Sequence, residues 1–517
     1  MVAEVLCGMV QGVEGQLITV QADVSEGLPV FHMTGSLSGE VKEARERVRT
    51  ALKNTGFRLP PKRIAVNLAP SDLKKAGTFF DLSIAVALLA ALQIIPGELT
   101  EGLLFLGELS LDGVLLPVHG VLPVLKKGME EGYTTYVIPQ ENIKEAGLLP
   151  GISVFGFHTL KEVVSWLLDK ESRAPFCGES AIDKEKSLRE NRPEDSLSPD
   201  FTDVKGQALA KRALEIAVAG FHNILLDGPP GAGKSMLAAC VPGIMPEMTE
   251  EEMIETTVIY SVRGLIHNDT GLISRRPFRA PSTATTPAGM FGGGLSPKPG
   301  EVSLAHHGVL FLDEFPEFKK DVIEMFRVTL EEHRVALSRS GRRLVFPADF
   351  LLIAAANPCA CGYFPDKERC RCTPREIIRY QNRLSGPILD RMDLFARCEV
   401  VPYQVLLKTG KEEPSEKIRN RVQEAWERQR ARFSERQPWF NGRMNIRETE
   451  RFCRTDEEGK RMLEEAFKHI KMSGRAYHRV LRVARTIADL AGEDRIRKEH
   501  LAEALLYRNT SDFRVEQ

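Results

Sequence analysis

The segment Gly228–Ser235, which reads GPPGAGKS, constrains the fold more than any other part of this chain. The residues before it, Asn223–Asp227, have the pattern of a strand, and a helical pattern begins at Met236. A glycine-rich loop between a strand and a helix turns backbone N–H groups toward phosphates, and the helix amino end adds positive potential. A chance match is the alternative, but it would not supply the correct flanking elements. We therefore predict a phosphate-binding loop in an α/β domain.

The residues of this loop are predicted to hold a nucleotide, and two of them carry specific contacts. We expect Lys234 to reach the β- and γ-phosphates and the Ser235 hydroxyl to ligate Mg²⁺. The other positions shape the loop around the phosphates; they are Gly228, Pro229, Pro230, Gly231, Ala232 and Gly233. ATP and Mg²⁺ are the predicted cofactors.

Two further apolar strands end in polar residues of the kind that such a site needs. The first covers 309–312 and leads into Asp313, expected to hold the water shell of Mg²⁺, and Glu314, expected to polarise the attacking water. The second covers 351–356 and leads into Asn357, expected to orient the water or to sense the γ-phosphate. The alternatives are an acidic turn and a simple Asn-Pro turn. The loop upstream favours the catalytic interpretation for both.

Length and composition indicate a globular protein with several domains. A chain of 517 residues, 43% hydrophobic and 27% charged, exceeds one ordinary core. The net charge of −1 gives no global basic field, although a local patch is enough to bind nucleic acid. The start lacks the pattern of a secretory signal, and the apolar stretch Leu82–Ile95 is too short to span a bilayer and is predicted as a buried helix. We expect a cytoplasmic protein without a membrane partner.

The secondary-structure pattern divides the chain into four parts. Strand and helix signals alternate through residues 1–170, which indicates a mixed α/β or α+β domain. Residues 171–200 are polar and rich in proline and are predicted to be a linker. A second α/β domain covers 201–401, and residues 402–517 are almost wholly helical.

Four of the nine cysteines cluster as two Cys-x-Cys pairs, formed by Cys359 with Cys361 and Cys370 with Cys372. One hairpin can bring four thiolates together, and such a set suits tetrahedral Zn²⁺. The spacing is tighter than the common Cys-x₂-Cys, and four free cysteines in a loop are the alternative. Four protein ligands leave no open position, so we predict a structural Zn²⁺.

Several longer segments carry a resemblance to a known family. They include GLPVFHMTG, VKEARERVRTAL, RPFRAPS, GGGLSPKPGEVSLAHHGVLFLDEFPEF, ANPCACGYF, LSGPILDRMDL and SGRAYHRVLRVARTIADL. With the phosphate loop, these segments resemble AAA+ ATPases of the magnesium-chelatase/ComM (YifB) family over nearly the whole chain. The resemblance implies a P-loop AAA+ α/β core with a helical lid, preceded by a Lon-protease-like α+β domain.

Two arginines and a ring assembly follow from this resemblance. Arg391, in LDRMD, resembles the arginine finger that such ATPases insert into the site of the neighbouring subunit, where it stabilises transition-state charge. Such a finger implies a ring, typically a homo-hexamer. Arg475, in SGRAYHR, resembles the sensor arginine of the lid, and Arg479 lies one helical turn away and could be confused with it. A plain surface arginine is the alternative for Arg391.

The resemblance also indicates where DNA would bind. The segment Thr256–Gly300 resembles the helix-2 insertion that points toward the ring pore, and residues 334–349 would form a β-hairpin. Near the hairpin tip, Arg339, Arg342 and Arg343 would grip a phosphate backbone without reading sequence. A solvated hairpin turn is the alternative. Relatives often carry a histidine pair after RPFRAP, where this chain has Ser282–Thr283.

The Lon-like domain is expected to lack protease activity. Its pattern places the nucleophile near Phe79 and the activating lysine near Leu122, and neither residue can do that chemistry. The favoured function is therefore a DNA-translocating ring motor, similar to a branch-migration helicase. The alternatives are a magnesium-chelatase motor subunit for metal insertion and an ATP-dependent protein remodeller.

Overall fold

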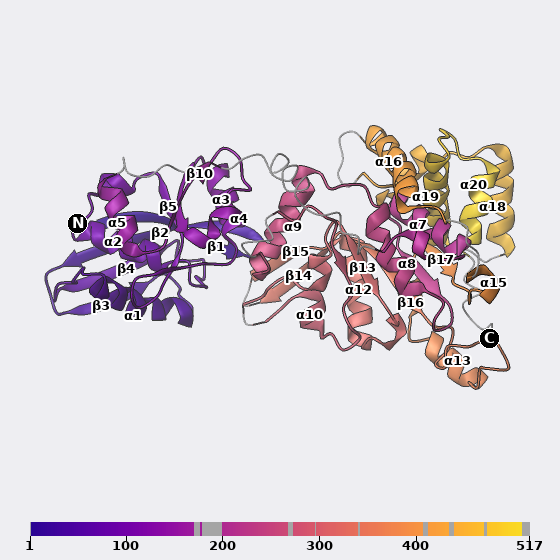
Figure 1. Ribbon diagram of the computed structural model, residues 1–517, viewed down its shortest axis with the longest axis horizontal. Helices are drawn as coiled ribbons and strands as arrows, with labels where there is room; N and C mark the ends of the chain where they lie inside the picture. The colour runs from indigo at the N-terminus through magenta and orange to yellow at the C-terminus, as the bar shows by residue number, and fades with distance from the viewer. Residues whose placement is uncertain are drawn as a thin grey trace.

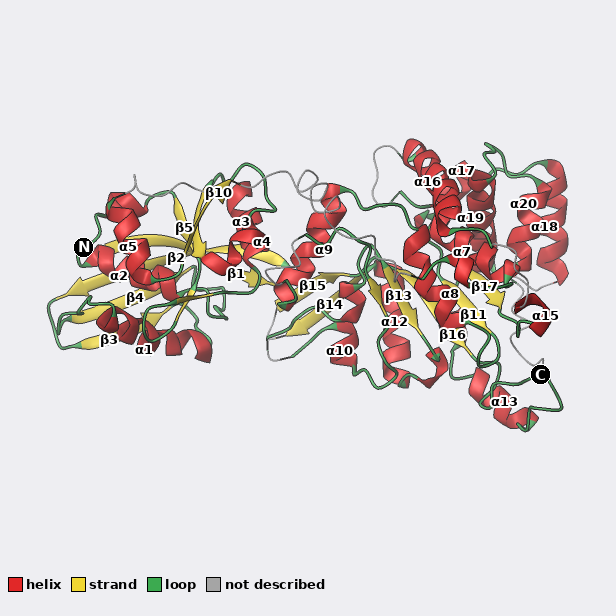
Figure 2. Cartoon of the chain, viewed as in Figure 1, coloured by secondary structure: helices red, strands yellow, loops and turns green. Residues whose placement is uncertain are grey.

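The computed structural model describes residues 2–169, 176–177, 199–266, 272–294, 296–339, 342–406, 412–433, 439–469 and 473–508. In Figure 1 these residues form an elongated arrangement, with the amino-terminal domain at one end, a second α/β domain in the middle and a helical group beside it. Figure 2 shows strands in the first two of these parts and helices alone in the third. The fold of the described residues is thus mixed α/β, with one large sheet in each of the first two parts and two further two-stranded sheets.

The amino-terminal domain is built on an eight-stranded mixed sheet in the order β10-β9-β8-β5-β1-β2-β4-β3. The long hairpin β1–β2 and the pair β2–β4 are antiparallel, whereas β1–β5, β5–β8, β8–β9 and β3–β4 are parallel. The strand bounds are Val2–Gln11 (β1), Glu14–Ser25 (β2), Val30–Thr34 (β3), Arg63–Ala69 (β4), Leu103–Phe105 (β5), Thr135–Pro139 (β8), Ser153–Phe157 (β9) and Phe176–Cys177 (β10), and a separate small sheet pairs Glu108–Leu109 (β6) with Leu115–Leu116 (β7).

The helices of this domain follow the apolar spacing of their sequences. In α1, the Ser38 side chain caps the first turn, and the buried Val41, Ala44 and Val48 recur at helical spacing. Residues 82–90 of α2 are all buried, which explains why that helix is apolar on every side. No helix in the described ranges is long and apolar enough to cross a membrane. The bounds are Gly39–Asn54 (α1), Asp81–Ala91 (α2), Val121–Glu130 (α3), Ile143–Ala146 (α4) and Leu160–Leu168 (α5).

The second domain contains a five-stranded sheet in the order β12-β13-β16-β11-β17, and all four of its pairings are parallel. Strands β11, β13 and β16 are buried along their whole length, as expected for a parallel sheet covered on both faces. The bounds are Ile224–Asp227 (β11), Phe278–Arg279 (β12), Val309–Leu312 (β13), Leu351–Ala356 (β16) and Leu394–Arg397 (β17), with helices Ala208–Gly220 (α7), Lys234–Cys240 (α8), Glu250–Arg263 (α9), Pro287–Phe291 (α10), Glu301–Leu304 (α11), Lys320–Glu332 (α12), Pro374–Gln381 (α13) and Gly386–Leu389 (α14).

A hairpin and a group of helices complete the chain. Strands Arg334–Arg339 (β14) and Arg342–Pro347 (β15) pair antiparallel immediately before β16. The long helix α19 packs against α7, α16 and α20 and so joins the helical group to the parallel sheet (Figure 1). The helices are Tyr403–Leu406 (α15), Ser415–Arg432 (α16), Ile446–Phe452 (α17), Glu457–His469 (α18), Gly474–Leu490 (α19) and Lys498–Leu506 (α20).

Helix α9 belongs to the second domain in sequence but packs into the core of the first. Its residues Met253 and Val258 are buried in the same apolar cluster as the amino-terminal sheet. The Ser261 hydroxyl near the end of α9 also hydrogen-bonds the buried carboxylate of Glu145. The two domains therefore share a core instead of being joined only through the chain between them.

Two sequence-based boundaries differ from the structure. The predicted linker 171–200 contains β10, whose residues Phe176 and Cys177 pair with β9 and extend the amino-terminal sheet; most of the linker lies outside the described residues. The expected insertion 256–300 begins inside α9, which already starts at Glu250 with a Thr249 capping box. The strand β10 takes its stability from main-chain pairing with β9, so the polar sequence around it does not exclude a strand there.

Candidate functional site

The loop 228–233 connects β11 to α8 and has a backbone that requires glycine. A Cβ atom on Gly228 would lie 2.2 Å from the carbonyl oxygen of Cys398 on the neighbouring chain segment. Gly233 has a φ of 84°, in the left-handed region that side chains rarely adopt. Helix α8 begins at Lys234, two residues earlier than the sequence pattern indicates. The loop therefore ends at a helix amino terminus, where backbone N–H groups are free to face an anion.

Lys234 lies buried at the centre of this loop and links it to a second strand. Its ammonium group donates to the carbonyl oxygens of Gly228 at 2.5 Å and Pro229 at 3.1 Å, and to Oδ1 of Asn357 at 3.0 Å. Burial lowers the pKa of Lys234, and neighbouring acidic groups oppose this shift. The lysine and the amide that follows β16 thus meet at the carboxyl edge of the parallel sheet.

The third component of the site comes from the end of β13. The Ser235 hydroxyl donates to Oδ2 of Asp313 at 2.7 Å, and Oδ1 of Asp313 accepts the N–H of Glu314 at 2.9 Å. Glu314 is exposed and has a φ of 50°, a left-handed conformation that costs a non-glycine residue roughly 1–3 kcal/mol. Such strain concentrates at functional positions.

This edge of the sheet can bind a polyphosphate together with a hard cation. The hydroxyl and carboxylate oxygens of Ser235 and Asp313 are the ligand type that Mg²⁺ prefers, and Glu314 is exposed beside them. At the end of β11, burial raises the pKa of Asp227 to about 6, against the attraction of Arg397 and Lys234. The structure therefore brings together Lys234, Ser235, Asp313, Glu314 and Asn357.

Arg391 lies apart from this group, in the segment that precedes β17. Its guanidinium donates to the carbonyl oxygens of Arg327 at 2.8 Å and Pro387 at 2.7 Å, and it forms an ion pair with Glu331 at 2.6 Å. Arg391 is buried, whereas the Glu331 side chain is 61% exposed. Within the chain, the arginine is thus held against the carboxyl end of α12.

The structure separates the two lid arginines that the sequence leaves close together. Arg475 is exposed in the first turn of α19. Arg479, one turn further on, forms an ion pair with the buried Asp393 at 3.0 Å. Arg479 therefore ties helix α19 to the segment before β17, whereas Arg475 faces solvent.

The four cysteines of the predicted zinc site lie together in a loop after β16. Their sulfur atoms all lie within 4.8 Å of one another, and the Sγ atoms of Cys359, Cys361 and Cys370 are 3.3 to 3.8 Å apart. Sulfur atoms bound to one tetrahedral Zn²⁺ at about 2.3 Å would be separated by about 3.8 Å. The N–H of Phe364 also donates to the sulfur of Cys359 at 3.4 Å. The donor set and spacing fit a tetrahedral metal.

The cysteine loop packs directly on the phosphate loop. Gly362, with a φ of 85°, lies so close to Pro230 that a Cβ atom would come within 2.5 Å of the proline Cδ. The carbonyl of Pro358 accepts a hydrogen bond from Gln381 of α13 at 3.1 Å. The shape of the cysteine loop is therefore coupled to the position of Pro230.

A second group of potential metal ligands, Glu255, His306 and His307, lies between the domains beside a cavity of about 690 Å³. Hydrogen bonds from the two histidines hold the pKa of Glu255 well below its usual range. Nδ1 of His306 accepts the N–H of Asp349, so the proton of the neutral ring is on Nε2, which faces Glu255. A metal would need the lone pair of that nitrogen, so this cluster fits a hydrogen-bonded network.

The remaining sequence-predicted positions lie away from the nucleotide loop. Arg343 is exposed near the turn of the β14–β15 hairpin, and the side chains of Arg339 and Arg342 lie outside the described residues. In the amino-terminal domain, Phe79 and Leu122 are both buried in the apolar core. At neither of these two positions does the chain offer a nucleophile or a base.

Comparison with known proteins gives matches along the chain. Three family models match in succession: subunit ChlI of Mg-chelatase at residues 20–142, magnesium chelatase subunit ChlI at 200–406, and its C-terminal model at 412–508. The competence protein ComM of Haemophilus influenzae is 42% identical over 500 residues, which are 96% of this chain and 95% of that protein. The chain belongs to the magnesium-chelatase-like ComM/YifB family. Family membership and the geometry at the sheet edge together support an AAA+ ATPase.

Two other relatives extend this comparison. The uncharacterized protein YifB of Escherichia coli is 39% identical over 504 residues, with 96% of this chain and 95% of that protein covered. Lon protease 2 of Bacillus subtilis is 30% identical over 129 residues, which are 25% of this chain and 23% of the protease. The ComM/YifB likeness therefore covers 96% of the chain, and the Lon likeness covers 25% of it.

Sequence reasoning missed several residues that surround the candidate finger. Glu331 pairs with Arg391, and Asp393, His222 and Asn223 form a buried polar network behind it. Asp393 stands two positions after Arg391 in LDRMD, directly before the apolar start of β17. Its partners could not be read from the sequence.

Proposed function

We propose that this ComM/YifB-family chain is an ATP-hydrolysing AAA+ motor that assembles as a hexameric ring and translocates on DNA, as a branch-migration helicase. The observation that carries the ATPase part is the convergence of Lys234, Ser235 and Asp313 with the exposed Glu314 at one sheet edge. The DNA part is supported by the resemblance to ComM and by the basic residues at the hairpin. The ATPase part also agrees with a core of parallel strands whose carboxyl ends carry the site.

In this mechanism, Lys234 exchanges its contacts with loop carbonyls for contacts with the phosphates of ATP. Ser235 and Asp313 would hold Mg²⁺, which supplies charge neutralisation at the phosphates. Glu314 polarises the attacking water, and Asn357 orients it. Arg391 of one subunit completes the site of its neighbour, so hydrolysis depends on the ring.

The motor proposal is tested by ATPase assays with and without DNA. Wild-type protein should hydrolyse ATP faster with single-stranded or forked DNA, and Glu314→Gln should abolish strand displacement on a forked substrate. The variant Arg339→Gln/Arg342→Gln/Arg343→Gln should lose DNA stimulation but keep basal hydrolysis, while Arg334→Gln at the hairpin base should keep both. If no nucleic acid stimulates hydrolysis, the DNA part is wrong and the ATPase part stands.

A magnesium-chelatase motor subunit is the second candidate, because all three matching family models carry that description. This alternative predicts ATP-dependent insertion of Mg²⁺ into a porphyrin when the chain is combined with partner subunits of a chelatase. A DNA-stimulated ATPase without such insertion would exclude it.

We further propose that Cys359, Cys361, Cys370 and Cys372 hold one structural Zn²⁺ per chain. The sulfur spacing and the N–H donated to Cys359 support this proposal. Metal analysis of purified protein should give about one equivalent of zinc, as expected for a closed four-cysteine site. Less than half an equivalent, or zinc retained by the double variant Cys361→Ser/Cys370→Ser, would contradict it.

A further inference from the structure

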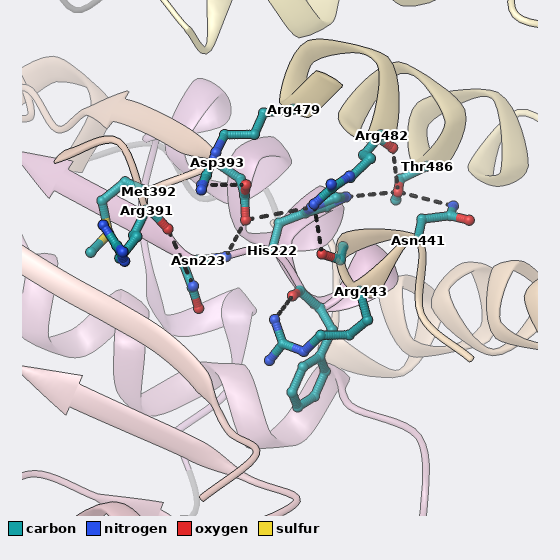
Figure 3. A network of polar contacts seen from close by, with 12 residues as sticks. His222, Asn223, Arg391, Met392, Asp393, Asn441, Arg443, Arg479, Arg482 and Thr486 are labelled. Atoms are coloured by element: carbon teal, nitrogen blue, oxygen red, sulfur yellow. Dashed lines mark hydrogen bonds and ion pairs between the residues drawn. The ribbon is translucent and has the colours of Figure 1, made fainter. Parts of the chain in front are cut away.

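The segment Arg391–Asp393 is held in place by a network of polar contacts at the amino ends of β11 and β17 (Figure 3). The carboxylate of Asp393 accepts the backbone N–H of Asn223 at 3.1 Å and the guanidinium of Arg479 at 3.0 Å. Asp393 is only 6% exposed. One carboxylate thus joins the parallel sheet to the lid helix α19.

Backbone hydrogen bonds couple this carboxylate to the candidate finger. The N–H groups of Asp393 and Leu394 both donate to the carbonyl oxygen of Asn223, at 2.8 and 3.1 Å. The side-chain amide of Asn223 donates in turn to the carbonyl of Arg391 at 3.3 Å, as Figure 3 shows. Because the backbone on both sides of Met392 is tied to Asn223, Arg391 cannot shift far without disturbing Asp393.

The charges around Asp393 make its ionised form essential to the arrangement. Burial opposes ionisation, but the attraction of Arg479 and Arg482 outweighs it and holds the pKa of Asp393 well below its usual range. The hydroxyl of Thr486 donates to the carbonyl of Arg482, so Nε2 of His222 is the donor to Thr486 at 2.8 Å. Burial lowers the pKa of His222, which is therefore neutral at pH 7. The negative charge of Asp393 is what attracts the lid arginines.

On the lid side, the network ends near the candidate sensor. Arg479 and Arg475 are four residues apart on α19, about one turn of the same rigid helix. The ion pair of Arg479 with Asp393 therefore fixes the amino-terminal end of α19 relative to the finger segment. In each protomer, the finger and the sensor are connected through one carboxylate.

We propose that Asp393 is a positioning residue that joins Arg391 and the amino-terminal end of α19 into one unit, which each subunit presents to its neighbour. This inference rests on the proposed ATPase function with a finger used in trans. Loss of the negative charge would leave the half-buried Arg479 and Arg482 without their compensating carboxylate, so the lid end and the finger would move independently. The defect would then lie in the subunit that donates the finger.

Mixed rings distinguish this role from a general structural one. Glu314→Gln subunits have a dead site and an intact finger, and Arg391→Ala subunits have the reverse. Mixing the two should restore hydrolysis to at most about one quarter of the wild-type rate, because one quarter of random interfaces pair an intact finger with an intact site. If this reference mixture stays inactive, the finger proposal itself has failed.

If that mixture regains activity, Asp393→Asn should behave as Arg391→Ala does, with an intact site of its own and a defective finger for its neighbour. Alone it should bind ATP with a dissociation constant within about twofold of wild type and hydrolyse it at least about tenfold more slowly, as expected when only transition-state stabilisation is lost. Mixed with Glu314→Gln it should regain activity, and mixed with Arg391→Ala it should not. Activity regained only with Arg391→Ala would overturn the proposal, because it would place the defect in the variant's own site.

Two controls keep the result interpretable. Glu503→Gln breaks another lid-to-core ion pair, with Arg212 at 2.8 Å, without touching the finger segment; its hydrolysis should stay within about twofold of wild type. Combining Asp393→Asn with Arg479→Gln should slow hydrolysis no more than the slower single variant, because both remove one interaction. Fully additive losses would contradict the shared role.

Discussion

Lys234 makes three hydrogen bonds to protein oxygens, so in this state the loop satisfies its lysine internally. Nucleotide binding must replace contacts to neutral carbonyls with contacts to charged phosphates, which are stronger. Glu314 has a different position, since it is exposed and has a strained backbone. The two residues should therefore fail in different ways when they are changed.

We predict that Lys234→Ala loses ATP binding, whereas Glu314→Gln keeps it. The glutamine preserves shape but cannot accept a proton, so hydrolysis should fall on the order of 100-fold or more, as for loss of a general base. Nucleotide titration by fluorescence and phosphate release by a coupled assay separate the two effects. Hydrolysis by Glu314→Gln at close to the wild-type rate would exclude this residue as the base.

Asp227 predicts a pH dependence of stability. Its pKa rises from the ordinary 3.8 to about 6 in the folded chain, because burial disfavours the charge. A raised carboxyl pKa means that stability is fully present below pH 3.8 and is lost as the pH rises through 6. The ionised form should lower the free energy of unfolding by about 3 kcal/mol. Asp227→Asn should become more stable than wild type between pH 4 and 6, measured by urea unfolding; an unchanged difference across that range would refute the prediction.

At the residue scale, sequence patterns indicate where polar residues stand directly after a short apolar strand. Asp313 and Asn357 are of this kind, because β13 and β16 end immediately before them and a parallel sheet brings the carboxyl ends of its strands to one edge. Asp393 is different, since its partner Arg479 lies 86 positions further along the chain. Only the docking of the lid brings them together, and no local pattern records that contact.

At the scale of elements, the strands that were easiest to predict are those buried on both faces. Strands β11, β13 and β16 are continuous apolar runs, whereas β3 is an edge strand with exposed residues and β10 has two residues in a polar stretch. Edge strands depend on main-chain pairing with a neighbour, and that neighbour is defined only by the fold. A strand that is buried on both faces can therefore be predicted from its apolar sequence, whereas a strand held only by main-chain pairing cannot.

The contact between the cysteine loop and the phosphate loop gives a prediction for Gly362. An alanine there would need a φ of 85° and would press on Pro230, so we expect Gly362→Ala to raise the KM for ATP severalfold and to cost about 1 kcal/mol of stability. Steady-state kinetics and thermal unfolding measure both effects. Gly151→Ala is the matched control, because its φ of 79° is similar and its Cβ would meet open space. Equal behaviour of the two variants would show that the loops are not coupled.

At the scale of the whole molecule, the feature that sequence patterns missed is the shared core. Residues 256–300 were predicted as an insertion of the second domain, and the apolar residues of α9 do not say by their spacing which domain they pack against. In the structure, Met248, Met253, Val258 and Leu272 complete the core of the amino-terminal domain. A movement of α9 during ATP turnover would therefore displace residues that pack against the amino-terminal sheet.

This shared core means that the peptide bonds between residues 171 and 198 are not what keeps the two halves of the molecule together. If a protease site were inserted there and cut, the fragments should co-elute in gel filtration, because separating them would expose the apolar face of α9 to water. Val258→Asp should let the cut fragments part, and the exposed Val400→Asp should not. Fragments that separate without any substitution would show that the chain connection is needed. Otherwise the molecule is, in effect, a non-covalent complex whose two members happen to be encoded as one polypeptide.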